Sequence, residues 1–162
     1  MIKFPDNFYW GAATSSYQVE GNNQNDWSKW EKKNAGRLAK EAGNYWQDWQ
    51  KEKFPGMLHK ENYISGLACD HYNRFEEDFD IAKSLGHNAH RFSIEWSRIE
   101  PEQGVFDEKE IEHYRQVIKA LKIQGIEPFV TLWHWPFPLW LADKGGWQSK
   151  KSVFYFSRYA EK

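Results

Sequence analysis

The stretch that decides the fold is EPFVTLWHWPFPLWLADKGGW, residues 127–147. It opens with the near-continuous apolar run EPFVTLW, which is typical of a parallel strand covered on both faces. The run ends at His134, which lies between two tryptophans, and prolines follow at positions 136 and 138. A core strand does not require such a histidine, and a surface loop rarely collects so much apolar area. The stretch therefore predicts a buried strand that leads directly into a ligand-binding segment.

Segments around this strand predict alternating strands and helices. Apolar residues at helical spacing predict two helices, with Asp70 and Asp107 as N-caps and a glycine after each C-terminal end. Glu110 follows Asp107 by three residues, which resembles a capping box. The expected elements are a buried strand at 8–18, a helix at 70–86, a strand at 87–96, a helix at 107–125, the strand at 127–133 and the start of a helix at 151–162. This order indicates a parallel α/β architecture.

A long connection, residues 20–69, interrupts the alternation. Within it, the segment RLAKEAGNYWQDWQKEKF, residues 37–54, has apolar side chains at helical spacing and predicts one helix. Insertions of this length in α/β folds often surround a binding face. A helix that packs over the body for stability is an equally good interpretation.

Composition excludes several classes of function. The net charge is -1, which does not indicate binding to nucleic acid or to an anionic membrane surface. No apolar run is long enough to span a membrane, and the first residues do not resemble a signal peptide. The single cysteine fits a reduced compartment, so we expect a cytoplasmic protein. The aromatic content of 18% fits either a large core or an aromatic-lined sugar cleft.

Polar residues gather where the predicted strands end. Gln18 ends the first strand, Arg91 and Ser93 lie near the end of the second, and His134 follows the third. Ligands of parallel βα sheets bind at the carboxyl ends of the strands, so these side chains are candidates for a binding site. A buried arginine requires a carboxylate or a ligand, and Arg91 has a purely structural alternative, pairing with a buried acid.

Strand alternation assigns these residues to faces. Arg91 and Ser93 share one face, and Phe92 and Ile94 share the other, where we expect helices to cover them. His134 alone would fit a core histidine, but its two indole neighbours favour a hydrogen bond to a substrate.

Other arrangements of functional side chains are not expected to be catalytic or to bind metal. Glu20 and Glu95 both precede loops, which disfavours a catalytic carboxylate pair. His87 and His90 lie three residues apart, and on a strand that spacing sends them to opposite faces. The sequence has no phosphate-binding glycine loop and no nucleophile elbow. We expect no metal and no cofactor.

Four motifs together resemble family 1 glycoside hydrolases, the β-glucosidase and β-galactosidase type. They are FYWGAATSSYQVEG, SGLACDHYNRFEED, HRFSIEWSRIEPEQG and GIEPFVTLWHWPFPLWLADKGGW, in this order along the chain. The resemblance implies a TIM (β/α)₈ barrel of which the first three βα units are present. Residues 1–162 would then be the N-terminal part of a single barrel domain, truncated before the fourth strand.

The resemblance also implies roles for individual residues. Gln18 and His134 would bind the hydroxyls of the cleaved sugar, Trp135 would form a wall beside it, and Arg91 would steady the nucleophilic carboxylate. The substrate would be a small β-glycoside or oligosaccharide with a terminal β-D-glucosyl or β-D-galactosyl residue, hydrolysed with retention. Both catalytic glutamates would lie beyond Lys162, so we expect the chain to be inactive alone.

Two other functions remain open. A carbohydrate-binding module could use the same aromatic residues without hydrolysis. An α/β interaction domain could present Trp46 and Trp49 to a partner. The sequence indicates no oligomeric state.

Overall fold

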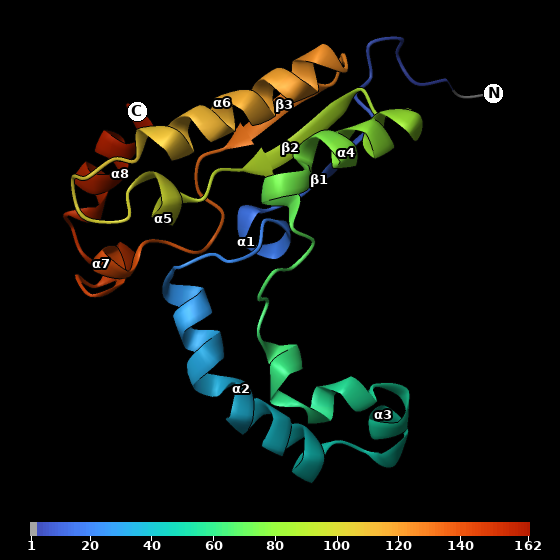
Figure 1. Ribbon diagram of the computed structural model, residues 1–162, viewed down its shortest axis with the longest axis vertical. Coiled ribbons are helices and arrows are strands. Elements are labelled where there is room, and N and C mark those ends of the chain that lie inside the picture. The colour runs from blue at the N-terminus through green and yellow to red at the C-terminus, as the bar shows by residue number, and fades with distance from the viewer. Residues whose placement is uncertain (1–2) are drawn as a thin grey trace.

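Three parallel strands form one sheet in the order β1-β2-β3 (Figure 1). The computed structural model describes residues 3–162. Strand β1 (Gly11–Ala13) pairs with β2 (Ala89–Ser93), and β2 pairs with β3 (Glu127–Thr131). The expected parallel α/β architecture is confirmed.

Helices connect and follow these strands. They are α1 (Ser16–Val19), α2 (Asp26–Tyr45), α3 (Asp48–Lys53), α4 (His71–Ser84), α5 (Trp96–Ile99), α6 (Glu108–Ile123), α7 (Leu139–Ala142) and α8 (Ser152–Ala160), with 3₁₀ turns η1 (Pro55–Leu58), η2 (Lys60–Tyr63) and η3 (Gly146–Gln148). Within residues 3–162, none of the helices combines the length and apolar character that crossing a bilayer requires.

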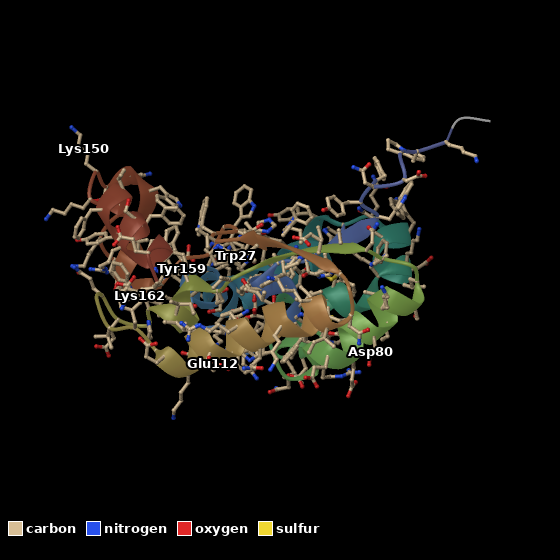
Figure 2. All side chains as sticks on the ribbon, turned by 90° about the horizontal axis from the view of Figure 1, so that it is seen from above. Trp27, Asp80, Glu112, Lys150, Tyr159 and Lys162 are labelled. Atoms are coloured by element: carbon tan, nitrogen blue, oxygen red, sulfur yellow. The ribbon has the colours of Figure 1, made fainter. Side chains whose placement is uncertain are left out.

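Helices α4 and α6 cover one face of the sheet (Figure 2). Helix α6 begins where the Asp107 carboxylate accepts hydrogen bonds from the backbone N–H of Lys109 (2.9 Å) and Glu110 (3.4 Å). Its apolar stripe is buried against the sheet, where Phe92 is also buried and Ile94 packs against the core. The predicted alternation of β2 is therefore confirmed. The stripe consists of Ile111, Tyr114, Val117 and Leu121.

The N-cap predictions are correct in position but not in detail. Glu110 does not complete the capping box, because its carboxylate accepts the hydroxyl of Tyr72 at 3.1 Å. Asp70 precedes α4 in the left-handed region, with φ 55°, and its side chain does not cap the helix.

The first predicted strand, at 8–18, is shorter than expected and is not buried. Only Gly11–Ala13 are in β1, and all three residues are exposed because β1 is an edge of the sheet. The chain then turns into α1, where the N–H of Ser16 donates to Ser93 Oγ at 2.8 Å. Gln18 therefore lies on a helix and not at the end of a strand.

Strand β3 also differs from its prediction as a strand covered on both faces. It is the other edge of the sheet, and Phe129 and Val130 remain 45% and 39% exposed. The apolar run belongs to a strand that has a partner on one side only in this chain.

The insertion forms an arm that projects away from the sheet (Figure 1). The single helix predicted at 37–54 is wrong, because α2 ends at Tyr45 and Trp46 is extended, with ψ 144°. The next helix, α3, starts after Gln47, whose N–H donates to Gln50 Oε1 at 2.9 Å. Trp49 is 56% exposed on this arm. The far half of α2 does not pack over the body, whereas its first turns lie beside α1.

Candidate functional site

A cavity of ≈ 440 Å³ lies at the carboxyl end of the sheet, between α1, the first turns of α2 and the segment after β3. We call it the first cavity. Three of the predicted site residues, Gln18, His134 and Trp135, meet in its wall. The full lining is Ser15, Tyr17, Gln18, Trp27, Glu31, Ser65, His134, Trp135 and Pro136.

Gln18 is held by its own helix turn. The hydroxyl of Ser15 donates to Gln18 Oε1 at 2.9 Å. This bond occupies the carbonyl oxygen of the amide and leaves the amide NH₂ as a donor on the exposed side of the residue. Gln18 can therefore donate to an oxygen of a ligand in the first cavity.

His134 has one tautomer because of Arg91. Arg91 Nη1 lies 2.9 Å from His134 Nδ1 and donates also to the carbonyl of Thr14 at 2.6 Å. An arginine has only donors, so Nδ1 must accept and Nε2 must hold the proton. Burial, and then the Arg91 charge, lower the pKa of His134, which keeps the ring neutral at neutral pH. His134 therefore offers an Nε2–H donor, while Arg91 lies behind it and outside the cavity lining.

Trp135 is held in an unfavourable backbone conformation at the mouth of the cavity. Its φ is 81°, a region that residues with a Cβ rarely adopt, and the residue is 69% exposed. Such strain persists only where the surrounding structure imposes it. Here Asp26 imposes it, because Asp26 Oδ1 accepts the N–H of Phe137 at 2.9 Å and the N–H of Asp26 donates to the carbonyl of Phe137 at 3.2 Å.

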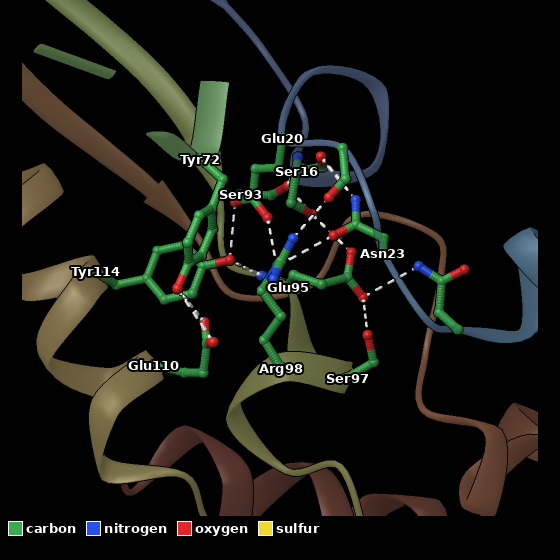
Figure 3. A network of polar contacts seen from close by, with 12 residues as sticks. Ser16, Glu20, Asn23, Tyr72, Ser93, Glu95, Ser97, Arg98, Glu110 and Tyr114 are labelled. Atoms are coloured by element: carbon green, nitrogen blue, oxygen red, sulfur yellow. Dashed lines mark hydrogen bonds and ion pairs between the residues drawn. The ribbon is translucent and has the colours of Figure 1, made fainter. Parts of the chain in front are cut away.

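Figure 3 shows a network of polar contacts that includes the buried carboxylate of Glu95. Glu95 is 1% exposed and accepts hydrogen bonds from Ser16 Oγ (3.0 Å), Asn25 Nδ2 (3.2 Å) and Ser97 Oγ (2.7 Å). Burial raises the pKa of Glu95, and these neutral donors oppose the effect. Asn25 is the N-cap of α2, so one side chain joins the starts of α1, α2 and α5.

Glu20 forms the second centre of this network. It accepts the hydroxyl of Tyr114 at 2.8 Å and Arg98 Nε at 3.1 Å. Burial raises the pKa of Glu20 to about 7, although Arg98 and Tyr114 favour the charged form. Neither Glu20 nor Glu95 lines the first cavity, and both are occupied by internal hydrogen bonds.

His87 and His90, which were not expected to bind a metal together, lie outside the first cavity. His87 precedes β2, so the argument from strand alternation is wrong for it, and it lines one hollow together with His90. Within the described part of the chain, no group of three or more His, Cys, Asp or Glu side chains is placed to hold a metal ion.

Six of the nine lining residues were not among the predicted site residues: Ser15, Tyr17, Trp27, Glu31, Ser65 and Pro136. Trp27 and Glu31 are four residues apart on α2 and therefore share a face, which is a signal that the sequence did contain. Ser65 had no such signal. Its N–H and hydroxyl both donate to the Glu31 carboxylate at 2.9 Å, across the width of the insertion.

Solved structures and curated sequences match nearly the whole chain. A β-glycosidase from Pyrococcus horikoshii superposes with a TM-score of 0.78 and 39% identity over 98% of this chain. Beta-glucosidase A of Thermotoga maritima is 40% identical over 98% of the chain, and Beta-glucosidase A of Acetivibrio thermocellus is 37% identical over 99%. In each case the chain spans about a third, 32%, of the relative's own length.

These solved relatives are family 1 TIM-barrel glycosidases, and the three-stranded parallel sheet corresponds to a part of their fold. The model of the family described as Glycosyl hydrolase family 1 matches residues 1–162. The resemblance that the four motifs indicated is thereby confirmed, and the chain belongs to glycosyl hydrolase family 1.

Proposed function

We propose that this chain forms the sugar-binding part of a retaining β-glycosidase that hydrolyses terminal β-D-glucosyl or β-D-galactosyl residues of small glycosides. The observation that supports it is the meeting of Gln18, His134 and Trp135 in the first cavity. Beta-glucosidase A of Thermotoga maritima is 40% identical to this chain, and a solved β-glucosidase from the same organism, 36% identical, is a complex with deoxynojirimycin.

The three side chains suit a pyranose ring. The amide NH₂ of Gln18 and the Nε2–H of His134 donate to sugar hydroxyls from two directions. The indole of Trp135 offers an apolar face and one N–H donor, which matches the mixed surface of a sugar. Because the donors are fixed before the sugar arrives, little side-chain entropy is lost on binding.

Arg91 has two roles in this proposal. Its Nη1 sets the tautomer of His134. Its Nε and Nη2 have no hydrogen-bond partner within residues 3–162, so they are the groups that would hold a nucleophilic carboxylate in its charged form.

The catalytic carboxylates come from elsewhere in the protein. Retaining hydrolysis requires two carboxyl groups about 5–5.5 Å apart. Among the described residues lining the first cavity, the only carboxylate is Glu31, and both of its oxygens already accept hydrogen bonds from Ser65. We infer that sequence following Lys162 supplies the acid/base and the nucleophile, and that residues 1–162 contribute one part of a single barrel domain.

Hydrolysis of a nitrophenyl β-glucoside tests the proposal. The full-length protein is expected to release nitrophenol, and the isolated 162-residue chain is expected to release none. Release by the isolated chain would contradict the placement of the catalytic carboxylates. Sugar binding without hydrolysis by the full-length protein would assign a carbohydrate-binding module instead.

A further inference from the structure

The lining of the first cavity is negatively charged. Among the described residues, Glu31 is its one side chain with a full charge, and this residue is 9% exposed on α2. Burial and the Arg91 charge lower the pKa of His134, so its imidazole is neutral at neutral pH. Arg91 itself lies outside the lining. The cavity therefore favours a cation over a phosphate or a carboxylate.

The Glu31 carboxylate has no cationic partner. Its two oxygens accept the N–H and the hydroxyl of Ser65, both at 2.9 Å, and these donors are neutral. Glu31 is absent from the ion pairs formed within residues 3–162. Its neighbour Lys32 is exposed and lines only an adjoining second cavity, of ≈ 340 Å³. Because a buried carboxylate is costly without an opposite charge, a cation bound in the first cavity would stabilise it.

A buried hydroxyl without a partner lies beside this carboxylate. Tyr17 is 8% exposed, and its hydroxyl makes no hydrogen bond within residues 3–162. Burial, followed by the nearby Glu31 carboxylate, raises the pKa of Tyr17, so the hydroxyl keeps its proton and its oxygen can accept. Buried hydroxyls are normally hydrogen-bonded, and an unpartnered one in a cavity wall indicates a ligand atom.

Aromatic rings complete this part of the wall. The rings of Tyr17 and Trp27 meet edge to face, with centroids 6.3 Å apart. Trp27 precedes Glu31 by four residues on α2, so the two side chains share a face of the helix. Cations bind over the faces of such rings, within about 6 Å of the centroid. An aromatic pair beside a carboxylate is an arrangement that recognises alkylammonium groups.

The hydrogen-bonding groups also match an ammonium. An alkylammonium has three N–H donors and no acceptor. Near Glu31 it meets the hydroxyl oxygens of Tyr17 and Ser65 and the lone pairs of the carboxylate that Ser65 leaves unused. A neutral hydroxyl could bind to the same oxygens, but it would leave the charge of Glu31 uncompensated.

We propose that Glu31 makes the first cavity select β-glycosides whose aglycone carries an alkylammonium group. The inference rests on the proposed function and deepens it, because it names a class of substrate for the same site. Gln18, His134 and Trp135 hold the sugar in that function, so the ammonium belongs to the group attached to the sugar. Glu31 is then a residue that determines specificity.

Calorimetric titration of the full-length protein tests this proposal. The ligands are 2-aminoethyl, 2-hydroxyethyl and propyl 1-thio-β-D-glucoside, which resist hydrolysis and differ only in a terminal ammonium, hydroxyl or methyl group. The variant Glu31→Gln removes the charge and keeps a carbonyl oxygen for the N–H of Ser65. The matched control is Glu41→Gln, the same change on the same helix at a residue that lines neither cavity.

We expect the parent and Glu41→Gln to bind the aminoethyl compound about tenfold more tightly than either neutral compound, through one charge-assisted contact. In Glu31→Gln the ratio of these affinities should fall to about one. A preference that survives Glu31→Gln would overturn the proposal. Equal affinity of the parent for the hydroxyethyl and aminoethyl compounds would also overturn it, and that result does not depend on whether the variant folds.

This outcome is separable from failure of the proposed function, because nitrophenyl β-glucoside carries no cation. A protein that hydrolyses nitrophenyl β-glucoside but does not prefer the aminoethyl compound retains the glycosidase assignment and loses the ammonium contact. A protein that shows the preference, and loses it in Glu31→Gln, but does not hydrolyse the aryl glucoside retains the contact and loses the assignment.

Discussion

Asp26 and Phe137 lie 111 residues apart and form two hydrogen bonds, through Asp26 Oδ1 at 2.9 Å and through the N–H of Asp26 at 3.2 Å. Asp26 is the first residue of α2, and Phe137 follows the segment that contains His134 and Trp135. These bonds join the two walls of the first cavity, which come from distant parts of the sequence. They explain how a tryptophan with φ 81° is kept in place.

Removing the Asp26 side chain, which accepts the N–H of Phe137, should weaken catalysis more than stability. Asp26→Ala leaves the N–H of Phe137 without its acceptor and frees the segment at Trp135. We expect kcat/KM of the full-length protein for nitrophenyl β-glucoside to fall about tenfold, the equivalent of one lost hydrogen bond. The matched control is Asp143→Ala, because Asp143 is 71% exposed and forms only a 4.0 Å ion pair with Lys29. Equal kcat/KM values for the two variants would contradict the role of the Asp26–Phe137 hydrogen bond.

Removing the buried carboxylate of Glu95 should cost much of the stability of the protein. Glu95→Ala leaves the donors of Ser16, Asn25 and Ser97 buried without an acceptor, at about 1–3 kcal/mol for each group left unsatisfied. We expect a loss of several kcal/mol in the free energy of unfolding, measured by urea denaturation of the full-length protein. Glu112→Ala, on the exposed face of α6, serves as the control and should change stability by less than about 0.5 kcal/mol. A small effect at Glu95 would show that the network does not fasten the helices.

Glu20 should make the free energy of unfolding depend on pH, in the range between the pKa of Glu20 in the unfolded state and its pKa in the folded state. Burial raises the pKa of Glu20 from 4.5 to about 7, so the folded state holds a proton that the unfolded state releases. The contribution of Glu20 is therefore fully present below pH 4.5 and is lost as the pH rises through about 7. Relative to Glu20→Gln, which does not titrate, the parent should lose about 3 kcal/mol over this range. Unfolding of both proteins at several pH values measures it, and a constant difference would contradict the prediction.

Arg91 should control both the tautomer and the pKa of His134. Removing its charge in Arg91→Ala should raise the pKa of His134 toward its ordinary value, because the Arg91 charge opposes protonation of the ring. The Nδ1–H tautomer should also become populated, since Nδ1 no longer has a donor facing it. Long-range ¹H–¹⁵N NMR correlations of the histidine ring report both quantities. Arg115→Ala, an exposed arginine on α6, is the control, and an unchanged His134 in Arg91→Ala would exclude the coupling.

Local patterns predicted helices α4, α6 and α8 and the central strand β2 well. Helix α6 and strand β2 follow from apolar periodicity alone, and Phe92 faces the helices as alternation requires. In contrast, α1 was predicted as a strand. Its turn depends on bonds from Ser16 to Ser93 and Glu95, residues that lie 77 and 79 positions away, and no local pattern contains that information.

The site was predictable through its motifs and only partly through physical patterns. The motifs predicted Gln18, His134 and Trp135 as sugar-binding residues, and the structure places all three in the wall of one cavity. The bonds between Asp26 and Phe137, and between Glu31 and Ser65, join segments that are remote in sequence. They arise from the tertiary arrangement of the insertion, so they could not be predicted before the fold was known.

The central claim is that Gln18 and His134 both donate to one sugar ring in the first cavity. Calorimetric titration of the full-length protein with deoxynojirimycin tests it directly. Gln18→Ala and His134→Ala should each weaken binding about tenfold or more, because each removes a hydrogen bond inside the cavity. Gln103→Ala and His59→Ala, which change exposed residues of the same types outside the cavity, should bind as the parent does. Unchanged affinity in both Gln18→Ala and His134→Ala would contradict the claim.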